Sequence, residues 1–339
     1  MTTATSPPAA LSRATRRAAW TILAAGAAVT AWGVWHNALF AQEIWQPAGL
    51  ARLGLLALSY AVWTALFFFT RPAWFAPVTI TLAVVFTAAA VGPVPVAATL
   101  LFLLSSFVTG ALLLGSAEIL ALLLGIAVWM AVIGAAAHFP VNYPLVYLAA
   151  LAGPLAVKPS RTLECLRVCA RLVRPVRFER RWTYLILAAA GFPLLCHLLV
   201  ALKPEMGTDA LAVHLMLPAW VSFQHVWPFD FRHLSWAVTP LGADWCYTAV
   251  YMLGGEFAAR LLNFALLAVV AALVYAGARR LVAPDVALLA AGLFASTPLV
   301  QLVTGSLFVE NLWAALLVGV LLALDRFHAS GEPRWLYAA

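Results

Sequence analysis

The feature that most constrains this chain is the recurrence of long apolar runs, which short groups of Arg, Pro and Gly separate along most of its 339 residues. Each run approaches the ~20 residues that an α-helix needs to cross a ~30 Å hydrocarbon core. Hydrophobic residues make up 65% of the sequence and charged residues 10%, whereas soluble domains have roughly 45–50% and about 25%. These values exclude a water-soluble globular protein.

The apolar runs are predicted to be helices, because unpaired backbone groups are too costly in lipid. We therefore expect an all-α integral membrane protein with about ten membrane-spanning helices. The predicted spans are 18–38, 50–69, 73–92, 94–114, 118–137, 141–157, 183–202, 258–278, 285–303 and 308–325. The run 141–157 is short and contains Gly153 and Pro154, so it is either a full crossing or a tilted or re-entrant segment.

The basic residues indicate an orientation. With a cytoplasmic N-terminus, 16 of the 20 Lys and Arg residues fall on the cytoplasmic side, as the positive-inside rule requires. The arginines before the first run favour a retained signal anchor. The basic segment 160–182 is expected to lie in the cytoplasmic interface. It separates an N-terminal membrane domain of about six spans, 1–159, from a second part, 183–339. The net charge of +7 thus reflects topology and does not favour a nucleic-acid partner.

The longest connection, of about 55 residues, lies between the spans ending near 202 and starting near 258, and long connections are usually functional or disordered. Its many aromatic residues favour short helices at the membrane interface instead of disorder. We expect an external site here that faces both water and lipid, with Asp230 and Asp244 as solvated loop acids. The ionisable residues of this segment include Glu205, Asp209, Asp230, Asp244, Glu256, His214, His225 and His233.

Several motifs of the second part carry a family resemblance. They are Gly207–Pro218 (GTDALAVHLMLP), Pro240–Tyr247 (PLGADWCY), Gly254–Asn263 (GGEFAARLLN), Ser296–Val300 (STPLV) and Phe308–Asn311 (FVEN). Residues 183–339 resemble bacterial polytopic glycosyltransferases of the GT-C fold, similar to the protein mannosyltransferase and lipid A aminoarabinose transferase group. The resemblance implies an inverting enzyme that moves a sugar from a polyprenyl-phosphate carrier to a lipid, glycan or protein acceptor. It also implies the outer face of the bacterial inner (plasma) membrane.

Carried over by position, the resemblance makes Asp209 the general base that takes the proton of the attacking hydroxyl. Considered without the resemblance, Thr208 or Asp209 could instead cap the N-terminus of an interfacial helix. The predicted topology independently places Asp209 and Glu310 on the same outer face. The candidates for substrate binding are His214, Glu310, Arg232 and Lys203, and the leaving phosphate could also be met by His233 or Arg260.

The sequence establishes no cofactor. A divalent metal could bind His214 and Glu310, but a third ligand at recognisable spacing is not evident, so we predict no metal site. Because a new apolar segment begins at Trp335, we expect a chain that is incomplete at its C-terminus. Two alternatives to an enzyme stay open: a transporter or flippase of lipid-linked substrates, and a non-catalytic scaffold that docks a partner through its first spans.

Overall fold

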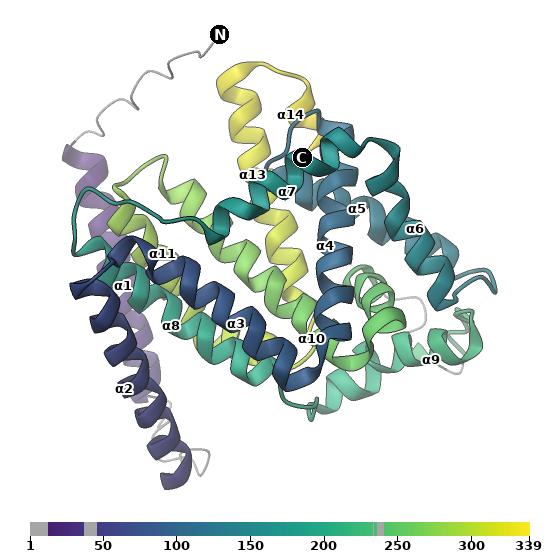
Figure 1. Cartoon of the computed structure of the whole chain (residues 1–339), viewed down its shortest axis with the longest axis horizontal. Coiled ribbons are helices and arrows are strands. Elements are labelled where there is room, and N and C mark those ends of the chain that lie inside the picture. The colour runs from purple at the N-terminus through teal and green to yellow at the C-terminus, as the bar shows by residue number, and fades with distance from the viewer. Residues whose placement is uncertain (1–12, 37–45, 233, 236–240) are drawn as a thin grey trace.

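A computed structural model describes residues 13–36, 46–232, 234–235 and 241–339 (Figure 1). All regular elements in these ranges are helices, so the predicted all-α membrane fold is confirmed. The α-helices are α1 Arg13–His36, α2 Pro47–Phe69, α3 Phe75–Val91, α4 Pro93–Leu114, α5 Ile119–Ala136, α6 Pro144–Val157, α7 Pro159–Cys169, α8 Thr183–Ala201, α9 Met216–Gln224, α10 Gly242–Ala278, α11 Pro284–Ala295, α12 Pro298–Gly305, α13 Glu310–Ser330 and α14 Arg334–Tyr337.

Within the described residues, 7 helices are long and apolar enough to cross a membrane. Helices α11 and α12 together would make an eighth, bent by 60°. The predicted count of ten is not confirmed, because α1 does not meet the same criterion and α6 has only 14 residues. A 14-residue helix is ~21 Å long, which is short of the ~30 Å hydrocarbon core.

Helix α10 differs most from the prediction. It begins at Gly242, well before the expected span start near 258, and it is interrupted at Gly255 (φ 70°, ψ −163°). The long external connection is therefore shorter than expected, and its last part, from Gly242 on, belongs to α10. Asp244 and Glu256 interrupt the apolar pattern that predicts a membrane-spanning helix, because acidic residues are rare in such helices. The sequence therefore did not predict this part of α10.

The core forms where α10 packs against α4, α5, α8, α11 and α13. The backbones of helices α4 and α5 come into close contact at Gly110 and Gly125. A Cβ atom at Gly110 would overlap the backbone of Ala121, and one at Gly125 would overlap the backbone of Ser106. Small residues of this kind let helix backbones meet where no hydrophobic force drives helices together.

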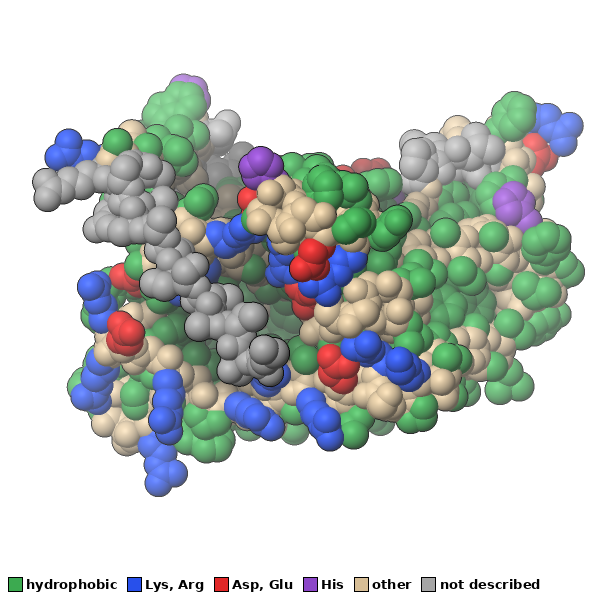
Figure 2. Space-filling view, turned by 90° about the horizontal axis from the view of Figure 1, so that it is seen from above, with side chains coloured by type: hydrophobic (Ala, Val, Ile, Leu, Met, Phe, Trp, Pro, Cys, Tyr) green, Lys and Arg blue, Asp and Glu red, His purple; other side chains and the backbone are tan. Residues whose placement is uncertain are grey.

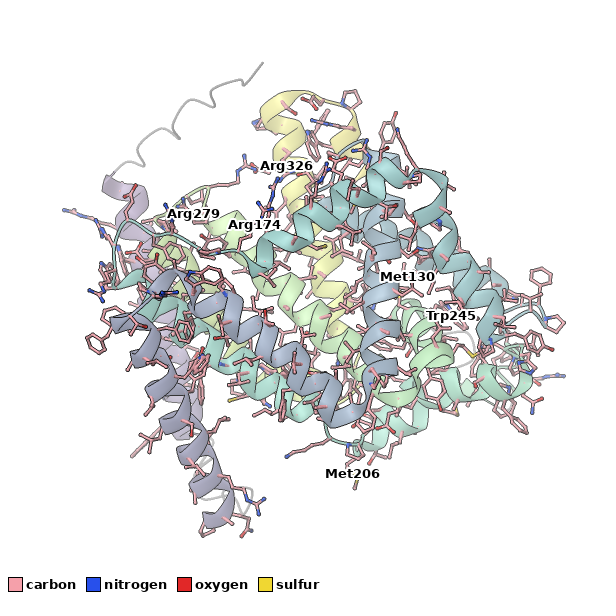
Figure 3. All side chains as sticks on the ribbon, viewed as in Figure 1. Met130, Arg174, Met206, Trp245, Arg279 and Arg326 are labelled. Atoms are coloured by element: carbon pink, nitrogen blue, oxygen red, sulfur yellow. The ribbon has the colours of Figure 1, made fainter. Side chains whose placement is uncertain are left out.

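The two ends of the bundle differ in charge. Figure 2 shows Lys and Arg side chains gathered on one face of the molecule, and Figure 3 shows Arg174, Arg279 and Arg326 at the end opposite Met206. Ion pairs connect helices at this basic end, including Arg326 with Glu118 and Arg280 with Asp325. Basic residues that the sequence analysis assigned to one side of the membrane thus lie at one end of the bundle.

We expect Gly110→Ala to destabilise the bundle by about 1–3 kcal/mol, because its new methyl group meets backbone that cannot move aside easily. The measurement is the midpoint of thermal unfolding in detergent. Gly54→Ala is the matched control, because no atom outside its own helix turn lies within 4 Å of an added Cβ there. Equal midpoints for both variants would contradict the close α4–α5 contact.

Candidate functional site

Two connections lie side by side at the end opposite the basic one: the segment that follows α8 and the loop between α12 and α13. The buried carboxylate of Glu205, whose side chain is 2% exposed, joins them. One oxygen accepts hydrogen bonds from the backbone N–H of Gly207 (2.8 Å) and the hydroxyl of Ser306 (3.0 Å). The other carboxylate oxygen accepts a hydrogen bond from the backbone N–H of Leu307 (2.8 Å) and forms an ion pair with Arg260. Glu205 therefore fixes one loop against the other.

Arg260 of α10 is 3% exposed and neutralises this carboxylate. Its other N–H groups donate to the carbonyl oxygens of Ala201 (3.2 Å), Val200 (3.0 Å) and Gly305 (3.0 Å). A buried ion pair is tolerated when such additional hydrogen bonds satisfy both partners. Arg260 thus serves the fold here, although the sequence made it a candidate for binding the leaving phosphate.

Gly207 allows the two connections to touch. A Cβ atom at this position would overlap the hydroxyl of Ser306 and would lie 3.1 Å from a carboxylate oxygen of Glu205. Glycine is the only amino acid that lacks a Cβ atom, so it alone fits at this contact. The short distance between the loops sets the position of Asp209, two residues further on.

Asp209 is exposed and stands at the start of a π-helical turn, Ala210–His214, which leads into α9. Its side chain makes no capping hydrogen bond, so the alternative role as an N-cap receives no support from the geometry. The turn is closed by a hydrogen bond of 2.7 Å from the backbone N–H of Leu215 to the carbonyl of Ala210. Such π-turns occur frequently at functional sites.

His214, at the end of this turn, is paired with Asp244 of α10. Nδ1 of the histidine lies 2.7 Å from Oδ1 of the aspartate, and the side chains are 13% and 2% exposed. The expectation that Asp244 is a solvated loop acid is wrong, because the early start of α10 buries its first turn. The ring of His214 also lies 5.8 Å from the ring of Phe308.

Acidic side chains from both connections act on the imidazole of His214. Burial lowers the pKa of its imidazole, but the hydrogen bond and charge of Asp244, followed by the charges of Glu310 and Asp209, raise it above the ordinary value. Glu310 is exposed in the first turn of α13. The structure therefore brings Asp209, His214 and Glu310 into one electrostatic group, and it adds Asp244, which the sequence analysis had taken for a solvated loop acid.

The other candidates are less closely connected. Lys203 is exposed, and the side chain of Arg232 is 74% exposed and pairs with Asp230 at 3.0 Å. Among the hydrogen bonds and ion pairs of the described chain, none joins either cation to the group around His214. His233 lies outside the described residues.

The donor geometry does not support a metal. Over the described ranges, no three His, Cys, Asp or Glu side chains are arranged to hold an ion. His214 and Glu310 therefore have no third side-chain ligand among these residues.

Fold and site together describe a polytopic helical membrane protein with a cluster of acids and a histidine at one end. Residues 238–339 match the model of the dolichyl-phosphate-mannose-protein mannosyltransferase family. This match confirms the predicted resemblance to GT-C-fold glycosyltransferases, and it includes Asp244 and Glu310 but not Asp209 or His214. No curated protein and no solved structure matches the chain. The match supports glycosyltransferase activity.

We expect Glu205→Gln to lower the free energy of unfolding by about 3–5 kcal/mol, because it removes the carboxylate that pairs directly with the buried guanidinium of Arg260. Thermal unfolding in detergent measures the loss. Glu164→Gln removes a more exposed pair with Arg161, so its cost should stay within about 0–1 kcal/mol. A similar small cost for both variants would show that Glu205 does not hold the loops.

Proposed function

We propose that the protein is an inverting glycosyltransferase that moves a sugar from a polyprenyl-phosphate carrier to an acceptor hydroxyl at the outer face of a bacterial inner membrane. The observation that carries the proposal is the group formed by Asp209, His214 and Glu310; Asp209 follows Met206 closely in the chain, and Met206 lies at the end opposite the basic one. The family match over 238–339 supports the reaction class and a lipid-linked sugar donor.

In this reaction the acceptor oxygen forms a bond to the anomeric carbon while the bond from that carbon to the phosphate oxygen breaks. Asp209 takes the proton of the hydroxyl, and the carrier leaves as polyprenyl phosphate. A single displacement of this kind inverts the anomeric carbon. Asp209 suits the role of base because its carboxylate is exposed and makes no capping hydrogen bond that would occupy it.

His214 is proposed to hold the donor phosphate. Asp244 engages Nδ1, so Nε2 can donate a hydrogen bond to a phosphate oxygen as negative charge develops there. Asp244 acts through the histidine and is a positioning residue, because it fixes the ring and favours its charged form. The buried Asp244 has no exposed surface of its own for a substrate.

Glu310 is proposed to accept hydrogen bonds from hydroxyl groups of the sugar. It is exposed at the start of α13, and its charge reaches His214. Lys203 and Arg232 are proposed to attract the anionic carrier to the membrane surface, since both are exposed cations of the same connecting segment. The GT-C-like core 183–339 packs through α10 against α4 and α5 of the N-terminal membrane domain, 1–159.

We expect Asp209→Asn to reduce sugar transfer about 10²–10⁴-fold, because an amide cannot accept the proton. The purified protein is supplied with radiolabelled polyprenyl-phosphate sugars and acceptor lipids, and product is counted. Asp325→Asn, at the basic end, is the control and should leave transfer unchanged. Equal transfer by Asp209→Asn and wild type would remove Asp209 from the mechanism. Movement of the carrier across liposomes without any transfer would favour a transporter instead.

Transfer should decline as the pH rises through the raised pKa of His214, because the uncharged ring loses its charge-assisted bond to phosphate. Asp244→Asn removes the interactions that favour the charged ring, so the declining limb should move to lower pH. The measurement is the pH profile of kcat/KM for wild type and Asp244→Asn. A declining limb at the same pH in wild type and Asp244→Asn would contradict the proposed role of His214 and Asp244. His214→Gln should abolish the limb altogether.

A further inference from the structure

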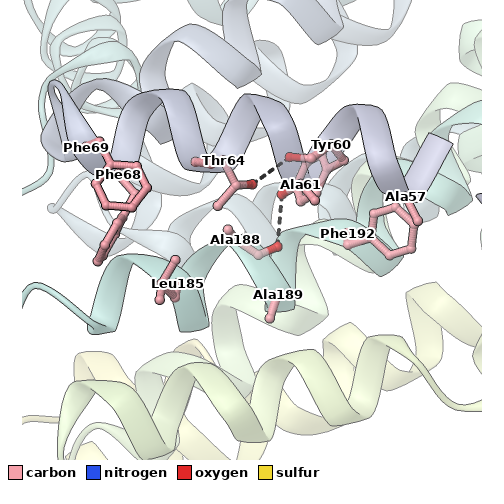
Figure 4. Close-up of a pocket in the computed structure, with 11 residues that line it drawn as sticks. Ala57, Tyr60, Ala61, Thr64, Phe68, Phe69, Leu185, Ala188, Ala189 and Phe192 are labelled. Atoms are coloured by element: carbon pink, nitrogen blue, oxygen red, sulfur yellow. Dashed lines mark hydrogen bonds between the residues drawn. The ribbon is translucent and has the colours of Figure 1, made fainter. Parts of the chain in front are cut away.

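An apolar groove lies between α2 and α8, away from the site described above (Figure 4). Its volume is about 580 Å³, which falls within the ~300–1,000 Å³ of ligand pockets. No residue of α2 is buried, so the groove opens on the lipid-facing side of the bundle. Small and aromatic side chains line it, among them Ala61, Thr64 and Phe68 of α2 and Leu185, Ala189 and Phe192 of α8.

The two hydroxyl groups in the groove wall are already used within the protein. Tyr60 donates to the carbonyl of Ala188 (2.9 Å), and Thr64 donates to the carbonyl of Tyr60 (2.8 Å), as the dashed lines in Figure 4 show. The wall therefore presents hydrocarbon to an occupant. An apolar chain fits this surface, whereas a polar ligand would lose its hydrogen bonds to water.

The length of the groove matches one leaflet. Its lining on α2 runs from Ala57 to Phe69, a distance of about 18 Å along a helix. Half of the ~30 Å hydrocarbon core is roughly 15 Å. A single acyl chain from one side of the membrane would therefore fill the groove from end to end.

A guanidinium lies at one end of the groove. Nη2 of Arg181 donates to the carbonyl of Phe68 (2.6 Å), and the guanidinium carbon lies 5.0 Å from the centre of the Phe68 ring. Among the described residues, no hydrogen bond uses Nε or Nη1 of Arg181. Either group can donate a charge-assisted hydrogen bond to a phosphate oxygen. The arginine belongs to the basic segment 160–182, which suits an anionic membrane surface.

We propose that this groove binds one acyl chain of an anionic phospholipid from the leaflet at the basic end, with the lipid phosphate on Arg181. The apolar wall, the length of one leaflet and the positive charge at a single end together select this occupant. The site is independent of the proposed transfer reaction, because it lies on α2 and the first half of α8, at the other end of the bundle.

The test is native mass spectrometry of the full chain in detergent with phosphatidylglycerol or phosphatidylcholine of identical acyl chains. Wild type should retain one phosphatidylglycerol in preference to phosphatidylcholine. Arg181→Gln should weaken the binding of phosphatidylglycerol by on the order of tenfold. Ala189→Trp, which fills the groove, should remove it. The matched controls are Arg177→Gln in the same basic segment and Ala89→Trp on the exposed face of α3, and both should bind as wild type.

A phosphatidylglycerol with a photoreactive acyl chain locates the bound lipid. Cross-links should fall on the α2 and α8 residues that line the groove and should disappear in Ala189→Trp, while non-specific labelling of α3 persists. Equal binding of the two phospholipids, equal loss in Arg181→Gln and Arg177→Gln, or labelling spread evenly over the bundle would overturn the proposal. So would displacement of phosphatidylglycerol by a second copy of the chain or by stoichiometric polyprenyl phosphate.

Discussion

The arrangement of this site depends on one buried ion pair, between Glu205 and Arg260. A carboxylate and a guanidinium can be buried together only when each has further hydrogen-bond partners. Here those partners are the end of α8, the segment that leads to Asp209, and the loop that leads to Glu310. The hydrogen bonds that the pair requires therefore hold these three segments together at one point. They also set the positions of the two exposed acids, Asp209 and Glu310, which lie further along two of these segments.

The acids of the site lie in different surroundings. Asp209 and Glu310 are exposed, whereas Asp244 is buried and paired with His214. Carboxylates in different surroundings can take different roles, because burial and neighbouring charges determine which form of each group is stable. The basic residues gather at the opposite end of the bundle.

Much of the fold could be predicted from the sequence, because the thickness of the bilayer sets the length of a spanning helix. The expected spans 94–114 and 118–137 correspond closely to α4 and α5. The start of α10 could not be found in this way, because Asp244 and Glu256 interrupt its apolar pattern.

The candidate site was predicted only in part. The motifs pointed to Asp209 and Glu310. Their exposure could be predicted, because each lies next to the end of a predicted span. The burial of Asp244 depends on a partner 30 positions earlier in the chain, and that of Glu205 on a partner 55 positions later. Such pairing follows from tertiary packing, so spacing along the chain does not reveal it.

The most direct measurement of the central claim, that the two connections form one site, is an NMR titration of His214 in the detergent-solubilised protein with ¹³C-labelled histidine. Its resonance would be assigned by its absence in His214→Gln. The account predicts a pKa above the ordinary value of a histidine, and a decrease in both Asp209→Asn and Glu310→Gln, because each acid lies on a different connection and stabilises the charged ring. An ordinary pKa that neither substitution changes would contradict it.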